Sequence, residues 1–229
     1  MKKKLYFIFF ICSSALFADN WKLILSKDGV KVYSSATAGS NFYRFKGTGV
    51  INAPASKVFT IIQDVSKVTQ WVEGSKNVKL LDKNFTAKSY DMKISQYYQV
   101  LYGQNSTPWP FQDRDYILKG RVNYNAKEDA AYIHLKNISL KSIPRKKDIT
   151  RMKEMVVNFK IKPLENNKCA IEFIVMVDPG GYIPAWAVNF MAKNEPLKTI
   201  RKLRKLARSE NYDKEIEKLV LFHMKNLRK

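Results

Sequence analysis

Cysteine and histidine are scarce in this chain of 229 residues, which contains two of each. Zinc sites take three or four ligands, most often cysteine and histidine, so a cysteine-rich zinc site is excluded. Cys12 lies in an N-terminal segment that we expect to be removed, which leaves Cys169 as the single thiol and excludes an intramolecular disulfide. We expect Cys169 to be a buried, unreactive side chain within a strand.

The shortage of histidines and thiols also argues against catalysis. His134 alternates with apolar neighbours in a way that places it on the surface, and His223 lies near the C-terminus. No nucleophile and base can be paired convincingly from this set. We therefore expect a protein that is not an enzyme and that needs no metal and no cofactor.

Glycine and proline are also infrequent, with nine and eight residues. This excludes collagen-like and proline-rich low-complexity chains. Hydrophobic residues make up 45% of the sequence, which is too many for a disordered protein. The length suits one large domain that can bury a core, or a core that encloses a cavity.

Acidic residues are outnumbered two to one, with 20 Asp and Glu against 41 Lys and Arg, a formal net charge of +21. Such a charge indicates an anionic partner, which could be nucleic acid, a membrane surface or an acidic ligand. The charge alone does not distinguish these partners.

The first eighteen residues have the pattern of a secretory signal peptide. Lys2–Lys4 form a basic start, an apolar stretch runs from Leu5 to Ala18, and the polar Asp19 follows. That stretch is shorter than the roughly 20 residues of a membrane-spanning helix. We expect cleavage after Ala18 and export, to the periplasm or as a secreted protein. The remaining chain keeps 38 basic and 20 acidic residues, and export argues against nucleic acid as a partner.

Alternating and helical hydrophobic patterns predict an α+β fold. Trp21 to Leu25 is a short helix or strand. Residues 41–51 form a strand whose Gly47 and Gly49 indicate curvature or an element packed closely over it, and a helical region runs from Pro54 to Trp71. The strands that follow have short links, which favours an antiparallel sheet; they are 78–81, 87–102, 114–122, 130–139, 152–161 and 168–177.

A turn at Asp178–Gly181 ends the strands, and Pro184 begins a long helix that we expect to be kinked at Pro196. Residues 209–229 read as a second, charged helical extension. The predicted organisation is a signal peptide over 1–18, one domain over 19–208, and this extension. A curved sheet around a long helix leaves space between them, and the pattern does not decide between a filled core and an apolar pocket.

Four segments narrow this choice. They are Trp21 with DGVKVY at 28–33, APASKVF at 53–59, PWPF and RDY within 108–116, and DPGGYIPAW at 178–186. In this order and spacing they resemble the START family, the StAR-related lipid-transfer domains, over about residues 21–208. The resemblance implies a helix-grip fold, in which a curved antiparallel sheet wraps a long C-terminal helix around an internal apolar tunnel. It also implies the binding of one lipid, under a movable lid formed by the helix and neighbouring loops.

Arg114 is the most informative charge on the expected tunnel wall. It shares a strand face with Tyr116, Leu118, Gly120 and Val122. It could anchor an anionic headgroup at the tunnel end, or it could form a salt bridge with a nearby acid such as Asp115; we favour the salt bridge. Some sterol-binding family members carry a second arginine further along this strand, where Gly120 stands here, so the resemblance does not imply that kind of sterol recognition.

Large apolar and aromatic side chains on the inward faces are the other candidates for the lipid tunnel, although each could equally be ordinary core. With Arg114 included, the predicted lipid-binding residues are Tyr90, Met92, Ile94, Tyr98, Arg114, Tyr116, Leu118, Phe159, Phe173, Trp186 and Phe190. Trp109 stands between two prolines, and we expect it to anchor its loop.

Basic residues crowd the C-terminal helix. They form either a solvated helix face or a surface that docks on an anionic membrane beside the lid. The predicted docking residues are Lys193, Lys198, Arg201, Lys202, Arg204 and Lys205.

Taken together, the sequence predicts an exported, monomeric lipid-binding protein that carries or senses a lipid in the cell envelope, with transient contact to anionic membranes. Two alternatives remain at this stage. One is a cyclase or hydrolase of the same helix-grip superfamily, which would need polar groups deep in the tunnel. The other is a basic module that binds acidic polymers of the envelope through salt-sensitive contacts.

Overall fold

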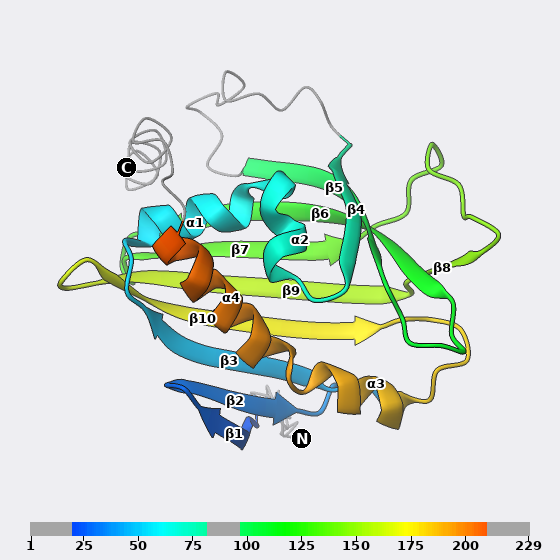
Figure 1. The fold of residues 1–229 in the computed structure, drawn as a ribbon, viewed down its shortest axis with the longest axis horizontal. Helices are drawn as coiled ribbons and strands as arrows, with labels where there is room; N and C mark the ends of the chain where they lie inside the picture. The colour runs from blue at the N-terminus through cyan, green and yellow to red at the C-terminus, as the bar shows by residue number, and fades with distance from the viewer. Residues whose placement is uncertain (1–19, 82–96, 210–229) are drawn as a thin grey trace, which may run out of the picture.

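The computed structural model describes residues 20–81 and 97–209. Within these residues ten strands form one sheet (Figure 1). In chain order the strands are β1 (Lys22–Lys27), β2 (Val30–Ser35), β3 (Arg44–Ile51), β4 (Ser75–Leu80), β5 (Tyr97–Asn105), β6 (Asp113–Asn125), β7 (Ala130–Asn137), β8 (Ile149–Arg151), β9 (Glu154–Leu164) and β10 (Lys168–Asp178).

The sheet has the order β1-β2-β3-β10-β9-β7-β6-β5-β4, and each neighbouring pair in this path is antiparallel. This confirms the predicted α+β architecture with an antiparallel sheet. The short strand β8 is a departure from it, because β8 lies parallel to the start of β6. The opening segment around Trp21–Leu25 is largely a strand, β1.

The helices cover one face of the sheet (Figure 1). They are α1 (Ala55–Gln63), the single 3-10 turn η1 (Val65–Lys67), α2 (Val68–Trp71), α3 (Ala185–Ala192) and α4 (Glu195–Ser209). α1 begins directly after Pro54 and buries Val58, Phe59, Ile61 and Ile62, as the helical spacing predicts.

The C-terminal helix differs from its prediction. In place of one long helix kinked at Pro196, the structure has two helices, α3 and α4, separated at Lys193 and Asn194. Pro196 occupies the first turn of α4, where its missing N–H costs no helical hydrogen bond. The first helix therefore ends before the proline, and the proline helps to start the next helix. The extension predicted over 209–229 lies outside the described residues beyond Ser209.

α4 packs directly on β3. A Cβ atom added at Gly47 would lie 2.6 Å from the Cβ of Pro196 and 3.1 Å from Cδ1 of Ile200. Of the two explanations for the paired glycines in this strand, close packing is therefore observed. Ile200 and Leu203 are fully buried between helix and sheet. The core next to them contains Phe159, whose ring lies 4.8 Å from that of Phe173, between centroids.

Candidate functional site

A cavity of about 560 Å³ lies between the sheet and the helices. Its walls come from the helical region that ends at Trp71, from β5, β6, β7, β9 and β10, and from α3 and the start of α4. Most of the lining side chains are apolar, and this volume is within the roughly 300–1,000 Å³ of small-molecule sites. The cavity answers the question that the sequence pattern left open, because the space under the helix is not filled by side chains.

Strand β6 supplies one complete wall of the cavity. Arg114, Tyr116, Leu118, Gly120 and Val122 alternate along it and all line the cavity. This is the face that strand periodicity predicts for these residues.

Tyr116 lies across a glycine on the neighbouring strand. Gly103 of β5 pairs with Tyr116, and a Cβ atom there would lie only 2.4 Å from the tyrosine oxygen. The missing side chain lets the ring cross β5, where its hydroxyl is 3.3 Å from the Ser75 hydroxyl. Burial raises the pKa of the Tyr116 phenol, so this side chain is a neutral hydrogen-bonding group in the cavity wall.

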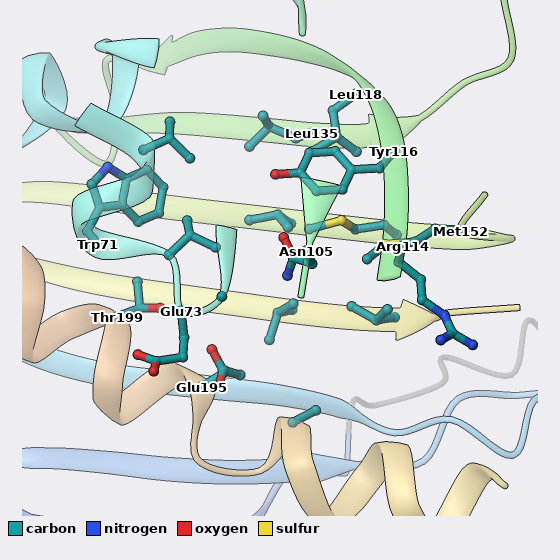
Figure 2. Close-up of a pocket in the computed structure, with 18 of the residues that line it drawn as sticks. Trp71, Glu73, Asn105, Arg114, Tyr116, Leu118, Leu135, Met152, Glu195 and Thr199 are labelled. Atoms are coloured by element: carbon teal, nitrogen blue, oxygen red, sulfur yellow. The ribbon is translucent and has the colours of Figure 1, made fainter. Parts of the chain in front are cut away.

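Arg114 is buried at one end of the cavity (Figure 2). Its guanidinium donates hydrogen bonds to three backbone carbonyls: Gln112, Pro179 at 3.5 Å and Gly180 at 3.2 Å. Burial lowers the pKa of Arg114, and the charge of Asp113 acts in the opposite direction. Because the ordinary pKa of arginine lies far above neutral pH, the side chain remains a cation.

The predicted salt bridge between Arg114 and Asp115 is wrong. Successive strand residues point to opposite faces, so Asp115 faces away from the cavity. Its carboxylate accepts two hydrogen bonds from Arg151 of β8, at 2.6 and 3.0 Å, and both side chains are almost fully buried. The neighbouring charges of Arg114 and Asp115 therefore make separate contacts. Among the described residues, the Arg114 guanidinium donates hydrogen bonds only to carbonyl groups.

The backbone segment after β10, whose carbonyl groups accept hydrogen bonds from Arg114, requires glycine at two positions. Gly180 and Gly181 have φ values of +66° and +70°, a region that side chains rarely adopt. A Cβ atom at Gly181 would also lie 3.3 Å from the Arg114 guanidinium. The two glycines thus permit the chain to leave β10, pass the arginine, and enter α3.

Two carboxylates lie at the other end of the cavity (Figure 2). Glu73 accepts a hydrogen bond of 2.5 Å from Lys202, which lowers the pKa of its carboxyl. Glu195 is more buried, and burial raises its pKa, although Lys198 at 3.5 Å opposes the shift. Neither carboxylate is predictable from the sequence, because each becomes part of the cavity wall only when α4 packs beside α2.

Asn105 lies between these ends (Figure 2) and is directly opposite Arg114 in the pairing of β5 with β6. Its buried side-chain oxygen has no hydrogen-bond partner among the described residues. A buried polar atom without a partner is costly, so this oxygen is available to a donor group of a bound molecule. No local sequence pattern singles out Asn105, because only the pairing register of β5 with β6 places it beside Arg114.

The structure brings together six of the predicted tunnel residues. Those that line the cavity are Arg114, Tyr116, Leu118, Phe159, Phe173 and Phe190. Tyr90, Met92 and Ile94 lie outside the described residues. Tyr98 belongs to β5 through its backbone pairing with Arg121.

Two tryptophan predictions are wrong. The sequence predicts Trp186 in the tunnel, but its side chain is 75% exposed and does not line the cavity. The residues of α3 that line the cavity are Val188, Phe190, Met191 and Ala192. Trp109 was expected to anchor its loop, but its side chain is almost completely exposed. Neither contributes to the cavity wall.

The basic residues of α4 make contacts within the protein. Arg201 pairs with Asp28 in the turn between β1 and β2. Arg204 donates to the carbonyl oxygens of Val50, Asp28 and Gly29, at 2.9, 2.6 and 3.2 Å. Lys202 pairs with Glu73, which follows α2. Together these contacts hold α4 to the β1–β2 turn and β3 on one side and to the segment after α2 on the other.

The other three predicted docking residues differ from one another. Lys198 pairs with Glu195, and Lys205 is exposed on α4. Lys193 lies at the break between the helices, with its ammonium 4.1 Å from the centre of the Phe190 ring. Membrane docking by all six residues stays a prediction.

Within 20–81 and 97–209, no helix is both long and apolar enough to cross a membrane. The same residues contain no group of three or more histidine, cysteine or acidic side chains placed to hold a metal ion.

Comparison with known proteins agrees with this geometry. A sequence model of the START domain matches residues 14–215. The rat phosphatidylcholine transfer protein is 26% identical over 184 residues, which are 79% of this chain and 80% of the relative. An uncharacterised protein of Pseudomonas aeruginosa is 28% identical over 87% of this chain and 92% of its own length. The crystal structure of a STAR-related lipid transfer protein from Xanthomonas axonopodis covers 83% of this chain and all of that one, with a TM-score of 0.69 and 25% identity.

Proposed function

This chain belongs to the START domain family, and on that premise we propose that it binds one lipid molecule in its cavity and carries it through the cell envelope. The observation that carries the proposal is the cavity itself: about 560 Å³ of space with mainly apolar walls under a sheet that is otherwise well packed. Side chains that line an empty apolar cavity lack the van der Waals contacts that they would make in a filled core. An apolar ligand in the cavity supplies those contacts. Burial at roughly 25 cal/mol per Å² drives the binding.

The polar end of the cavity suits the headgroup of a phospholipid. Arginine has five N–H donors, and the carbonyl bonds described above use only three of them. The remaining donors of Arg114 fit the oxygens of a phosphate. The unpartnered amide oxygen of Asn105 can accept a hydrogen bond from a hydroxyl or amino group of the same headgroup. A glycerophospholipid is therefore the first candidate, which agrees with the similarity to phosphatidylcholine transfer protein.

Entry and exit of the lipid require part of the cover to move, and α3 is the part that we expect to move. α4 is held by salt bridges and buries much of one side, whereas α3 buries only Val188. Asn189 provides its main polar attachment, accepting from the Tyr43 amide at 2.9 Å and donating to the Asn41 carbonyl at 3.0 Å. Local opening is easiest where few apolar contacts must be broken.

Native mass spectrometry of the protein purified from its own cell envelope tests lipid binding. We expect one lipid per chain, recovered chemically unchanged, which also tests the expectation that the protein is not an enzyme. A protein that stays empty after exposure to the lipids of its host contradicts the proposal. A chemically altered lipid would instead favour the enzymes of the same superfamily.

A matched pair of variants on β7 connects the bound lipid to the cavity. Leu135 lines the cavity, whereas Lys136 is exposed on the opposite face of the same strand. Leu135→Trp fills part of the space and is expected to reduce lipid occupancy strongly. Lys136→Trp adds the same ring outside the cavity and is expected to leave occupancy unchanged.

Export to the periplasm is part of the proposal and is supported by the pattern of residues 1–18. Cell fractionation with detection of a C-terminal tag tests it. We expect a product shortened by about eighteen residues outside the cytoplasm. Full-length protein confined to the cytoplasm contradicts export but leaves the lipid-binding proposal intact.

A further inference from the structure

Asn105, the last residue of β5, presents an unused hydrogen-bond acceptor in the wall of the cavity (Figure 2). Its side-chain oxygen is buried, and no group within residues 20–81 and 97–209 donates a hydrogen bond to it. Buried polar atoms of native proteins nearly always have a partner, because a buried acceptor without one is costly. The oxygen therefore indicates that a molecule in the cavity supplies the missing donor.

The neighbouring amide of Gln104 shows that the protein can satisfy such a group by itself. Gln104 lies on the opposite face of β5 and is also buried. Its side-chain oxygen accepts a hydrogen bond of 2.7 Å from Asn77, and its nitrogen donates one of 2.7 Å to the Tyr102 hydroxyl. The amide that faces away from the cavity is thus fully bonded, whereas the amide that faces the cavity has an open acceptor.

The side chains beside Asn105 in the sheet are occupied elsewhere. Ser75 of β4 and Arg114 of β6 are its partners in the strand pairing. The Ser75 hydroxyl is 3.3 Å from the Tyr116 hydroxyl, and the Arg114 guanidinium donates to three backbone carbonyls. The acceptor of Asn105 is therefore left for the occupant of the cavity.

We propose that Asn105 selects the headgroup of the bound lipid, favouring phospholipids whose headgroup carries an N–H or O–H donor over phosphatidylcholine. The inference rests on the proposed function, in which the headgroup of a phospholipid lies at the Arg114 end of the cavity. Every glycerophospholipid offers a phosphate to Arg114, so that contact does not distinguish headgroups. Ethanolamine and glycerol headgroups also carry donors for Asn105, whereas the choline nitrogen carries only carbon substituents.

Phosphatidylcholine would bury the Asn105 oxygen against methyl groups, with no donor to replace the lost water. A site built around a hydrogen-bonding group rejects an analogue that lacks the matching group, because the buried polar atom stays unpaired. We expect this to favour donor-bearing headgroups at least about tenfold.

Native mass spectrometry of the full chain after incubation with mixed vesicles tests the proposal. The vesicles contain equal amounts of phosphatidylethanolamine, its N-methyl and N,N-dimethyl derivatives, and phosphatidylcholine, all with the same acyl chains. The protonated dimethyl headgroup keeps one N–H, and the trimethyl headgroup of phosphatidylcholine has none. We expect the first three lipids to load equally and phosphatidylcholine at least about tenfold less, a difference that we call the dimethyl-to-trimethyl step.

A second set of vesicles separates the donor from the positive charge of the headgroup. Phosphatidylglycerol has hydroxyl donors and no cationic group, and we expect it to load as well as phosphatidylethanolamine. Exclusion of phosphatidylglycerol would overturn the proposal, because the protein would then recognise an ammonium charge. An even decline with each added methyl group would also overturn it, because headgroup size would then decide.

Three variants assign the step to one side chain. Asn105→Leu removes the acceptor at similar size, so we expect phosphatidylcholine to load as well as the dimethyl lipid. Asn105→Asp keeps an oxygen acceptor and is expected to keep the step. Gln99→Leu is the matched control, because it makes the same replacement on the cavity face of the same strand, opposite Gly120; it is also expected to keep the step.

The variants can contradict the proposal in three ways. They are a step that survives Asn105→Leu, an equal loss of the step in Gln99→Leu, and a loss in Asn105→Asp, which would assign recognition to the amide N–H. Total lipid occupancy separates this inference from the proposed function. A protein that loads every lipid equally contradicts headgroup selection alone, and a protein that loads none contradicts lipid binding and headgroup selection together.

Discussion

The close contact between α4 and β3 makes Gly47→Ala a sharp test of how the cavity is covered. The new Cβ atom would lie 2.6 Å from the Cβ of Pro196, about 1 Å closer than ordinary carbon contacts of roughly 3.5–4.0 Å. Pro196 and Ile200 are buried, so neither can give way unless α4 shifts. Overpacking of this kind costs about 1–3 kcal/mol. The stiffer unfolded chain of an alanine variant offsets about 0.4–1 kcal/mol of that cost.

The expected net loss is about 1–2 kcal/mol of the free energy of unfolding, or a melting temperature lower by about 2–8 °C. Gly120→Ala is the matched control, because it is also a strand glycine on the inner face. Its Cβ atom would meet Leu135 at an ordinary 3.5 Å, and we expect it to be neutral or slightly stabilising. Thermal unfolding followed by circular dichroism measures both, and equal melting temperatures would refute direct packing of α4 on β3.

Four further predictions concern other parts of the structure. Asp115→Ala leaves the buried charge of Arg151 unpaired and should cost about 3–5 kcal/mol in chemical denaturation; a loss below about 1 kcal/mol contradicts a buried pair. Asn189→Ala removes two hydrogen bonds that hold α3, so lipid transfer between vesicles should become about fivefold faster; an unchanged rate argues against α3 as the moving part. Burial raises the pKa of the Cys169 thiol to about 12, so in protein produced without residues 1–18 a thiol reagent at pH 8 should react only after unfolding. Burial also raises the pKa of Glu195, so ionisation in the folded state costs stability. Glu195→Gln should match the unchanged protein at low pH and become the more stable of the two as pH rises above the ordinary glutamate range; a constant difference across pH contradicts this.

Local periodicity predicted what depends on one strand or one helix at a time. The alternation of Arg114, Tyr116 and Leu118 places them on one face wherever β6 lies, and these three residues line the cavity. The START resemblance then supplied the order of the elements and the expectation of an internal space. Both kinds of information are contained in short stretches of sequence, which is why they could be recognised before the structure was known.

What could not be predicted depends on partners that are distant in sequence. Asp115 is paired with Arg151 because β8 returns beside the start of β6, a parallel contact that no local pattern indicates. Arg204 bonds to the carbonyl of Val50, 154 residues earlier. The basic residues of α4 are therefore predicted from the sequence to face solvent or a membrane, although several of them bond to other parts of the protein and hold the helix in place.

The break between α3 and α4 would allow α3 to move away from the cavity while α4 stays in place. α4 is fixed by buried apolar residues and by Arg204, so its departure would disrupt the core. α3 buries only Val188 and presents Trp186 and Phe190 outward, so its departure breaks few contacts.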